Sequence, residues 1–103
     1  MTNIPIERRS FPRFPFELPI LINEIDGRRG FEGITRNVSR TGVFFYTCEQ
    51  LPADSAVQFR MVMPAEIMLG QGRRIVARAT VLRVQPSDSG IGVAVRIETD
   101  ISA

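Results

Sequence analysis

The stretch Ile91-Gly92-Val93-Ala94-Val95-Arg96-Ile97-Glu98 alternates without a break between branched apolar residues and small or polar ones. An alternation of period two places the branched side chains on one face of a β-strand and the others on the opposite face. The turn-forming sequence Pro86-Ser87-Asp88-Ser89-Gly90 stands directly before it, and the run from Arg73 to Val84 precedes that turn. These three segments predict two strands joined by a turn, the first of them long.

Four further strands are expected on the N-terminal side of this pair. Period-two alternation or aromatic-rich apolar runs predict them at residues 14–22, 31–38, 43–47 and 57–63. Turn-forming sequences, among them Asp26-Gly27 and Leu51–Ser55, separate these segments. Six short strands without a convincing amphipathic helical pattern predict an all-β fold, either a small antiparallel barrel or a sandwich.

The same patterns assign several side chains to the core or to the surface. Pro15 and Pro19 cannot donate ladder hydrogen bonds, so the first strand is expected at a sheet edge or with bulges. Free cysteine is often buried, and the single cysteine, Cys48, follows an aromatic run, which predicts a core or strand position. Four phenylalanines are expected in the core and two arginine pairs on the surface: Phe14, Phe16, Phe44 and Phe45, and Arg28-Arg29 and Arg73-Arg74.

The composition excludes several classes of function. The 103 residues are enough for one domain. Histidine is absent and there is one cysteine, so the commonest general base and a cysteine-rich zinc site are both missing. The eleven acidic residues form no motif, and we predict no enzyme, no catalytic residue and no metal site.

No apolar run approaches the roughly 20 residues of a membrane span. The N-terminus also lacks an apolar leader pattern, so we expect a cytoplasmic protein.

All thirteen basic residues are arginine, whose planar guanidinium can hold a phosphate with two hydrogen bonds and can stack on a base. The net charge of +2 is too small to predict bulk binding to nucleic acid, and we expect no DNA partner. Three arginines, Arg8, Arg9 and Arg13, lie close together in an N-terminal segment that has no apolar periodicity. We interpret residues 1–13 as a mobile arm that orders on binding.

Two motifs add a more specific indication. Arg9 and Arg13 form an RxxxR pair, and Asn37-Val38-Ser39-Arg40-Thr41-Gly42 forms an NxSxxG stretch. In this order and at this separation, ahead of a run of strand patterns, the two resemble the signature of the PilZ family, the bacterial receptor domains for cyclic di-GMP. The resemblance extends from about Glu7 to Glu98. It implies one domain, residues 1–103: an arm (1–13), a six-stranded antiparallel β-barrel (14–98) and a short tail (99–103).

The resemblance also implies which residues bind the ligand. Arg9 and Arg13 would contact guanine and phosphate groups, as the RxxxR arginines of the family do. Arg8 stands directly before them, where an arginine in the family favours a stacked pair of ligands over a single one. No other cofactor is implied.

The second motif would form the barrel side of the site. Asn37 and Ser39 would contact a guanine edge, Gly42 would let the turn approach the ligand closely, and Arg40 would add a phosphate or stacking contact. Asn37 stands where the family frequently has aspartate. An amide oxygen accepts hydrogen bonds without a charge, so weaker binding is expected.

Three functions remain open, in order of preference. The first is a cyclic di-GMP receptor or adaptor that signals through a separate partner protein of the motility, secretion or polysaccharide machinery. The second is a protein-interaction barrel that binds no nucleotide, as in family members without the arginine motif. The third is a small barrel that binds single-stranded nucleic acid. The third is ranked last because the aromatic residues are expected to be buried and the charge is low.

Overall fold

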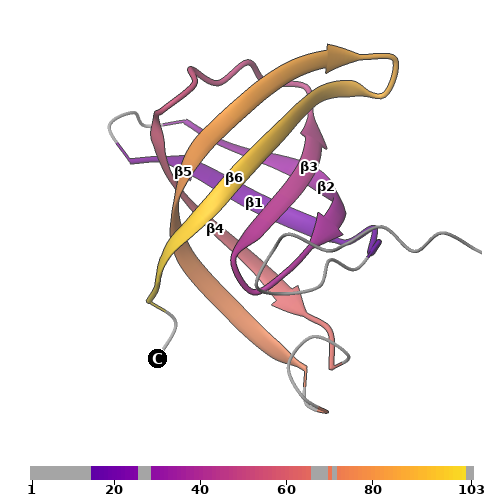
Figure 1. Ribbon diagram of the computed structural model, residues 1–103, viewed down its shortest axis with the longest axis vertical. Coiled ribbons are helices and arrows are strands. Elements are labelled where there is room, and N and C mark those ends of the chain that lie inside the picture. The colour runs from indigo at the N-terminus through magenta and orange to yellow at the C-terminus, as the bar shows by residue number, and fades with distance from the viewer. Residues whose placement is uncertain (1–14, 26–28, 66–69, 71, 102–103) are drawn as a thin grey trace, which may run out of the picture.

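Six antiparallel strands close into a barrel in the computed structural model, which describes residues 15–25, 29–65, 70 and 72–101 (Figure 1). The strand order around the barrel is β1-β2-β3-β6-β5-β4, and β1 pairs with β4 to close it. The strands are β1 (Pro19–Glu24), β2 (Gly30–Val38), β3 (Gly42–Thr47), β4 (Ala56–Met63), β5 (Arg73–Ser87) and β6 (Gly90–Asp100). The predicted six-stranded antiparallel barrel is confirmed, and the alternative of a sandwich is not.

The β5–β6 hairpin is the longest unit of the barrel and crosses Figure 1 from bottom to top. The strand predicted at 73–84 continues to Ser87, beyond Pro86, so the predicted end was wrong. The hairpin returns at Gly90, whose φ of 116° lies in the left-handed region that favours glycine. None of the described residues forms a helix that could cross a membrane.

The first strand differs most from its prediction. It begins at Pro19 instead of Phe14, and residues 15–18 lie outside any strand. The expectation of an edge strand is also wrong, because β1 pairs with β2 on one side and with β4 on the other. Pro19 is tolerated because it occupies the first position of the strand, and the pairing with β4 starts only at Leu21.

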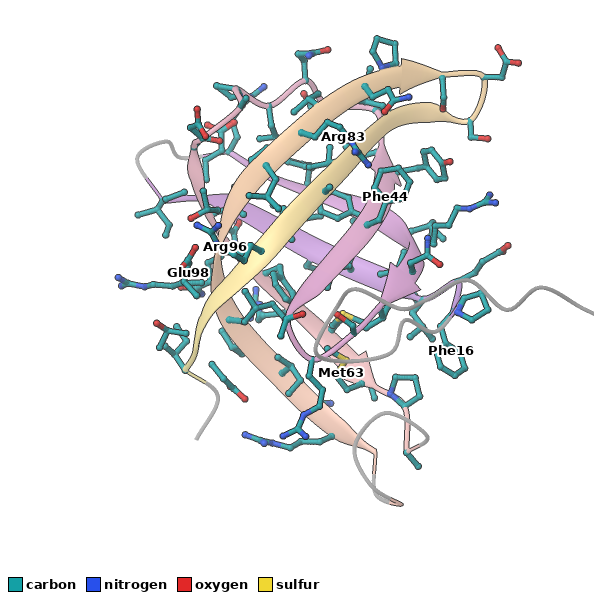
Figure 2. The ribbon with its side chains drawn as sticks, in the orientation of Figure 1. Phe16, Phe44, Met63, Arg83, Arg96 and Glu98 are labelled. Carbon is teal, nitrogen blue, oxygen red and sulfur yellow. The ribbon has the colours of Figure 1, made fainter. Side chains whose placement is uncertain are left out.

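Alternating side chains from all six strands fill the inside of the barrel. Phe45 and Phe59 are fully buried at its centre, as predicted for Phe45. Phe16, although outside the strands, packs partly buried against this core (Figure 2), and Phe14 lies outside the described residues. The burial of these apolar side chains is the main stabilising term of the fold, at about 1.5–3 kcal/mol for a fully buried large side chain.

Two core predictions are wrong for the same reason. In β3 the inward positions belong to Val43, Phe45 and Thr47. Phe44 therefore faces outward (Figure 2). Its ring packs edge-to-face against Tyr46, with 5.3 Å between the ring centroids. Cys48 follows the inward-facing Thr47 and is exposed. The predicted surface positions of Arg29, Arg73 and Arg74 are confirmed, and Arg28 lies outside the described residues.

Candidate functional site: a pocket on the outer face of β1, β2 and β3

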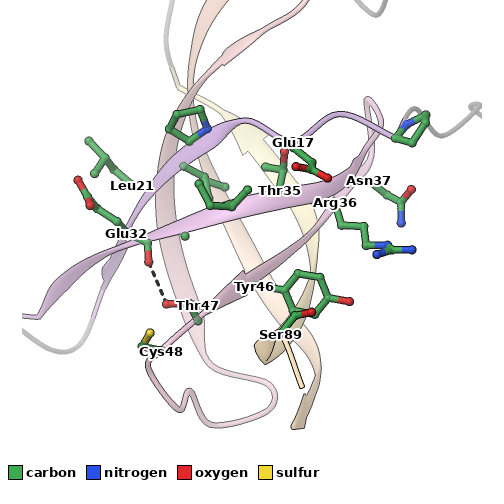
Figure 3. Close-up of a pocket in the computed structure, with 15 residues that line it drawn as sticks. Glu17, Leu21, Glu32, Thr35, Arg36, Asn37, Tyr46, Thr47, Cys48 and Ser89 are labelled. Atoms are coloured by element: carbon green, nitrogen blue, oxygen red, sulfur yellow. Dashed lines mark hydrogen bonds between the residues drawn. The ribbon is translucent and has the colours of Figure 1, made fainter. Parts of the chain in front are cut away.

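A pocket of about 1000 Å³ opens on the outside of the barrel (Figure 3). Its walls come from residues 15–21, from β2, from the end of β3 and from Ser89 at the tip of the β5–β6 hairpin. Two carboxylates, Glu17 and Glu32, and two polar neighbours on β2, Arg36 and Asn37, line it. The pocket is thus mixed in charge and open to solvent, and it lies beside the segment that continues from the predicted arm.

A β-bulge in β2 determines which side chains face this pocket. Thr35 pairs with Phe45, but Asn37 pairs with the adjacent Phe44, so Arg36 is an extra residue in the ladder. The bulge lets both Arg36 and Asn37 face outward into the pocket and returns Val38 to the core, where it is fully buried. In a regular strand Asn37 would share the inward face of Thr35.

Thr35, next to the bulge, ties residues 16–18 to the barrel. Its side chain is buried, with 1% of its surface exposed. The Thr35 N–H donates to the Leu18 carbonyl (2.8 Å), and the Leu18 N–H donates to Thr35 Oγ1 (2.8 Å). The hydroxyl itself donates to the carbonyl of Phe16. These three hydrogen bonds replace a strand ladder at a place where Pro19 offers no N–H. They fix the stretch that contributes Pro15 and Glu17 to the pocket.

The other residues of the NxSxxG stretch build the turn between β2 and β3. Ser39 is buried, and its Oγ accepts hydrogen bonds from the N–H groups of Thr41 (3.2 Å) and Gly42 (3.1 Å). A Cβ at Gly42 would lie 2.9 Å from the carbonyl oxygen of Val95, so only glycine lets this turn pack against β6. Neither residue lines the pocket, and the predicted contacts of both with the ligand stay predictions.

Among the predicted binding residues, then, Asn37 is the one that the structure places in the pocket wall. Arg40 is exposed on the turn after Ser39 and does not line the pocket. Arg8, Arg9 and Arg13 lie outside the described residues. The sequence interpretation missed Glu17, Thr35 and Arg36. Three polar residues in a row, 35–37, interrupt the alternation of β2, and this was the signal for a bulge.

On the β3 side of the pocket, Thr47 Oγ1 donates a hydrogen bond to the carbonyl of Glu32 on β2 (2.9 Å; Figure 3). The exposed Cys48, the next residue, also lines the pocket.

Nearby but outside the pocket, Arg29 forms hydrogen bonds with the side chains of Glu24 and Glu49. The hydrogen bond with Glu24, followed by the attraction of its charge, raises the pKa of the Arg29 guanidinium. Within the described part of the chain, no group of acidic, cysteine or histidine side chains is placed to hold a metal ion.

Comparison with known proteins agrees with this architecture. The chain is similar in structure to the Bacillus subtilis inhibitor of motility (MotI/DgrA), with a TM-score of 0.75 and 17% identity. The similarity covers 94% of this chain but 46% of that protein, so the chain spans about half of its length. The PilZ domain of CeSA from a cellulose-synthesizing bacterium is also similar (TM-score 0.55, 21% identity, 85% of this chain and 82% of that one).

At these identities the two structures show a shared fold and no more. No curated protein sequence matches the chain significantly. The PilZ domain, however, matches residues 7–103, which is nearly the whole chain and includes both motifs. The protein therefore belongs to the PilZ domain family, a family of cyclic di-GMP receptor domains without a catalytic role.

Proposed function

We propose that this protein binds cyclic di-GMP in the outer pocket, that binding orders the N-terminal arm against the barrel, and that a separate partner protein reads the change. The observation that supports this most is the bulge in β2. It directs the side chain of Asn37, the first residue of the NxSxxG stretch, toward a pocket whose wall includes Pro15, two residues after Arg13 in the sequence. In this proposal the barrel supplies one half of the site and the arm the other.

The chemistry of the ligand fits such a divided site. Cyclic di-GMP has two phosphate charges and two guanine edges. The guanine N1 and N2 groups are donors, which the side-chain oxygen of Asn37 accepts. Guanine O6 and N7 are acceptors, for which a guanidinium is the commonest specific partner. Arg36, beside Asn37 in the pocket, adds a cation that the family motif does not specify.

Two carboxylates in the same pocket can supply the negative charge that Asn37 lacks at a position where the family frequently has aspartate. Glu17 and Glu32 both line the wall. A carboxylate accepts both donors of the guanine edge with a charge, which an amide cannot do. Glu17 comes from the segment tied to Thr35, so its position is fixed relative to Asn37 by the barrel itself. We assign it the role of a second acceptor for the guanine edge.

The arm contributes Arg9 and Arg13, with Arg8 setting the number of ligands. Bidentate arginine contacts contribute about 1–3 kcal/mol each. Ordering the arm costs about 1–2 kcal/mol for each fixed residue. The near balance of these terms gives a moderate affinity that depends strongly on each arginine. The partner class remains that of motility, secretion or polysaccharide machinery.

Calorimetric titration with cyclic di-GMP tests the proposal directly, with GTP and cyclic GMP as controls. Selective binding in the micromolar range or tighter is expected. An equivalence of two ligands per chain supports the role of Arg8, and an equivalence of one contradicts it. No heat near 100 µM ligand, which corresponds to a binding free energy weaker than about −5.5 kcal/mol, would instead favour the protein-interaction barrel. A single-stranded oligonucleotide is a further control. The aromatic residues were expected to be buried, but Phe44 and Tyr46 are partly exposed and so are open to stacking with bases.

Variants separate the residues of the site from the overall charge. Arg13→Ala is expected to lower the affinity at least tenfold, about 1.4 kcal/mol, with unchanged thermal unfolding. Arg83→Ala is the matched control, because Arg83 is an exposed arginine of β5 that does not line the pocket. Equal losses in both variants would mean that charge alone attracts the ligand.

Cys48 offers a readout of pocket occupancy without mutation. It is the only cysteine, it is exposed and it lines the pocket. Alkylation of its thiol by iodoacetamide is expected to slow severalfold when cyclic di-GMP is saturating, and not when GTP is added. An unchanged rate at saturating ligand would place the bound ligand outside this pocket.

A further inference from the structure

A second concavity, of about 540 Å³, lies on the outer face of β1, β4 and β5, on the other side of β1 from the pocket. Its lining is mostly apolar, with Arg60 and Arg74 as the charged residues. The register places its side chains in two adjoining rows: Leu21 pairs with Arg60, which pairs with Val76, and Val62 pairs with Arg74. We call this surface the β4 groove.

Exposed apolar side chains lie together in the β4 groove. Val62 is 57% exposed and Leu21 is 42% exposed, although outward positions of such barrels are usually polar. The two lie on neighbouring strands of one wall, so they form a continuous patch instead of isolated residues. Contiguous apolar patches with a polar rim mark interaction sites.

No described acidic side chain pairs with the arginines around the β4 groove. The side chains of Arg60, Arg74 and, one row further, Arg78 form no hydrogen bond or ion pair with any residue that the structure describes, although their backbones belong to the strand ladder. Four acidic residues elsewhere on the barrel each pair with an arginine: Glu24 and Glu49 with Arg29, Glu98 with Arg96 and Asp100 with Arg73. The β4 groove thus combines an apolar floor with cations that have no acidic partner among the described residues, and arginine is among the residues enriched at protein interfaces.

The β4 groove also shares its wall with the ligand pocket. Pro19 and Leu21 line both. In the segment tied to Thr35, Pro15 and Glu17 face the pocket, whereas Leu18 lines the β4 groove. A ligand in the pocket would therefore lie against residues of β1 that also line the β4 groove.

We propose that the β4 groove is the docking site for a partner protein, through a segment in which apolar side chains are flanked by carboxylates. The apolar floor selects such a segment over nucleic acid, and the concave shape selects it over a flat membrane surface. Docking itself needs only the groove. Its control by cyclic di-GMP rests on the proposed function, because the shared wall of β1 transmits the change.

Selection of a random peptide library displayed on phage against the full chain tests this proposal. The selected peptides are expected to combine Asp or Glu with Leu, Ile, Val or Phe. A synthetic copy of the most enriched peptide should bind the wild type in a fluorescence anisotropy titration. Arg60→Glu should weaken it at least tenfold, and Val62→Asp should do the same through loss of the apolar contact. Arg83→Glu, the same charge change on an exposed arginine outside the groove, should bind as the wild type does.

Each other outcome overturns the proposal or one part of it. No enrichment, enriched peptides without acidic residues, or equal binding by Arg60→Glu would remove the β4 groove as an acidic-segment site. Binding to phosphatidylglycerol vesicles that Arg60→Glu abolishes, without peptide enrichment, would assign the groove to a membrane. A dimer that Arg60→Glu dissociates in sedimentation would assign it to a second copy. Thermal unfolding confirms that each variant folds.

Titration of the same proteins with cyclic di-GMP keeps this proposal separate from the proposed function. Arg60→Glu is expected to bind cyclic di-GMP as the wild type does while failing to bind the peptide. Peptide binding by a chain that does not bind cyclic di-GMP would leave the docking site in place and remove its ligand control. A peptide affinity that stays constant within twofold as cyclic di-GMP saturates the wild type would also contradict the control through β1.

Discussion

The β2–β3 and β4–β5 pairs are antiparallel ladders in the wall of the same barrel, and they differ in continuity. The β4–β5 ladder runs without a shift from Ala56 opposite Thr80 to Met63 opposite Arg73. The β2–β3 ladder is interrupted at Arg36, between Thr35 and Asn37. The continuous ladder alternates strictly between core and solvent, whereas the interrupted one places two successive polar side chains in a pocket.

This difference separates what the fold requires from what the site requires. In β4, every second residue is needed in the core, so the strand has no freedom in its register. In β2, the extra residue lets Val38 return to the core after the polar pair. The bulge is thus compatible with the core, and it lies where the pocket is.

Deletion of Arg60 from β4 should have the largest effect. The deletion would turn Met61 and Met63 outward, and both are buried in the native barrel. The loss is on the order of 3–6 kcal/mol for two such side chains, against a total stability of roughly 5–15 kcal/mol. We expect a sharp drop in the thermal unfolding midpoint measured by circular dichroism. Arg60→Ala, which keeps the register, should change stability by about 0.5 kcal/mol or less; a comparable loss in that variant would refute the register argument.

Thr35→Val should have the next largest effect, because it removes the hydroxyl that holds residues 16–18. The Leu18 N–H would lose its acceptor and the Phe16 carbonyl its donor. A buried group left without a partner costs about 1–3 kcal/mol, measurable as a lower denaturation midpoint in urea. Thr35→Ser keeps the hydroxyl and is expected to retain most of the stability. If both variants lose the same amount, the methyl group and not the hydroxyl is responsible.

These two ladders also show why the fold could be predicted from the sequence. Period-two alternation can be read from neighbouring residues alone. It predicted all six strands, and the predicted bounds of β3 and β4 lie within one residue of the observed ones. The start of β1 was missed because Phe16 and Leu18 continue the alternation and still pack on the core. Their backbone is held by the Thr35 side chain instead of a ladder, and side-chain bonding of this kind leaves no periodic signal.

The site was predicted in part. The NxSxxG stretch identified Asn37, but it did not show that Ser39 and Gly42 would build the turn while Asn37 faces the pocket. That division depends on the position of the bulge and on the contact of Gly42 with β6. The register of three strands determines both. Cys48 was misplaced for a related reason, since its outward direction follows from Thr47 taking the last inward position of β3.

Deletion of Arg36 should have a smaller effect on stability than the deletion in β4. Without it, β2 becomes regular, with Thr35 inward, Asn37 outward and Val38 inward, so we expect a change of about 1 kcal/mol or less in urea unfolding. Affinity for cyclic di-GMP should fall about tenfold, because the pocket wall loses a cation and the twist of the bulge. Arg36→Ala keeps the bulge. An equal loss of affinity in that variant would assign the effect to the side chain alone.

Removal of a surface ion pair should have the smallest effect, and it tests whether charges on the outer side of β6 matter for the fold, at Glu98, where the β5–β6 register shifts. The hydrogen bond from Arg96 (2.9 Å; Figure 2), followed by one from Thr80, lowers the pKa of Glu98. A carboxyl group whose pKa is lowered by folding stabilises the folded state at pH values above its pKa in the unfolded chain. This contribution is lost as the pH falls through the folded-state pKa.

Arg96→Gln should therefore raise the pKa of Glu98 in an NMR titration of its carboxyl carbon. The thermal midpoint at pH 7 should hardly change, since exposed ion pairs contribute little. An unchanged pKa would mean that Thr80 alone stabilises the carboxylate. A clear loss of stability would mean that outward charges on β6 help to hold the barrel, in contrast to the arginines of the β4 groove, which have no acidic partner in the described part of the chain.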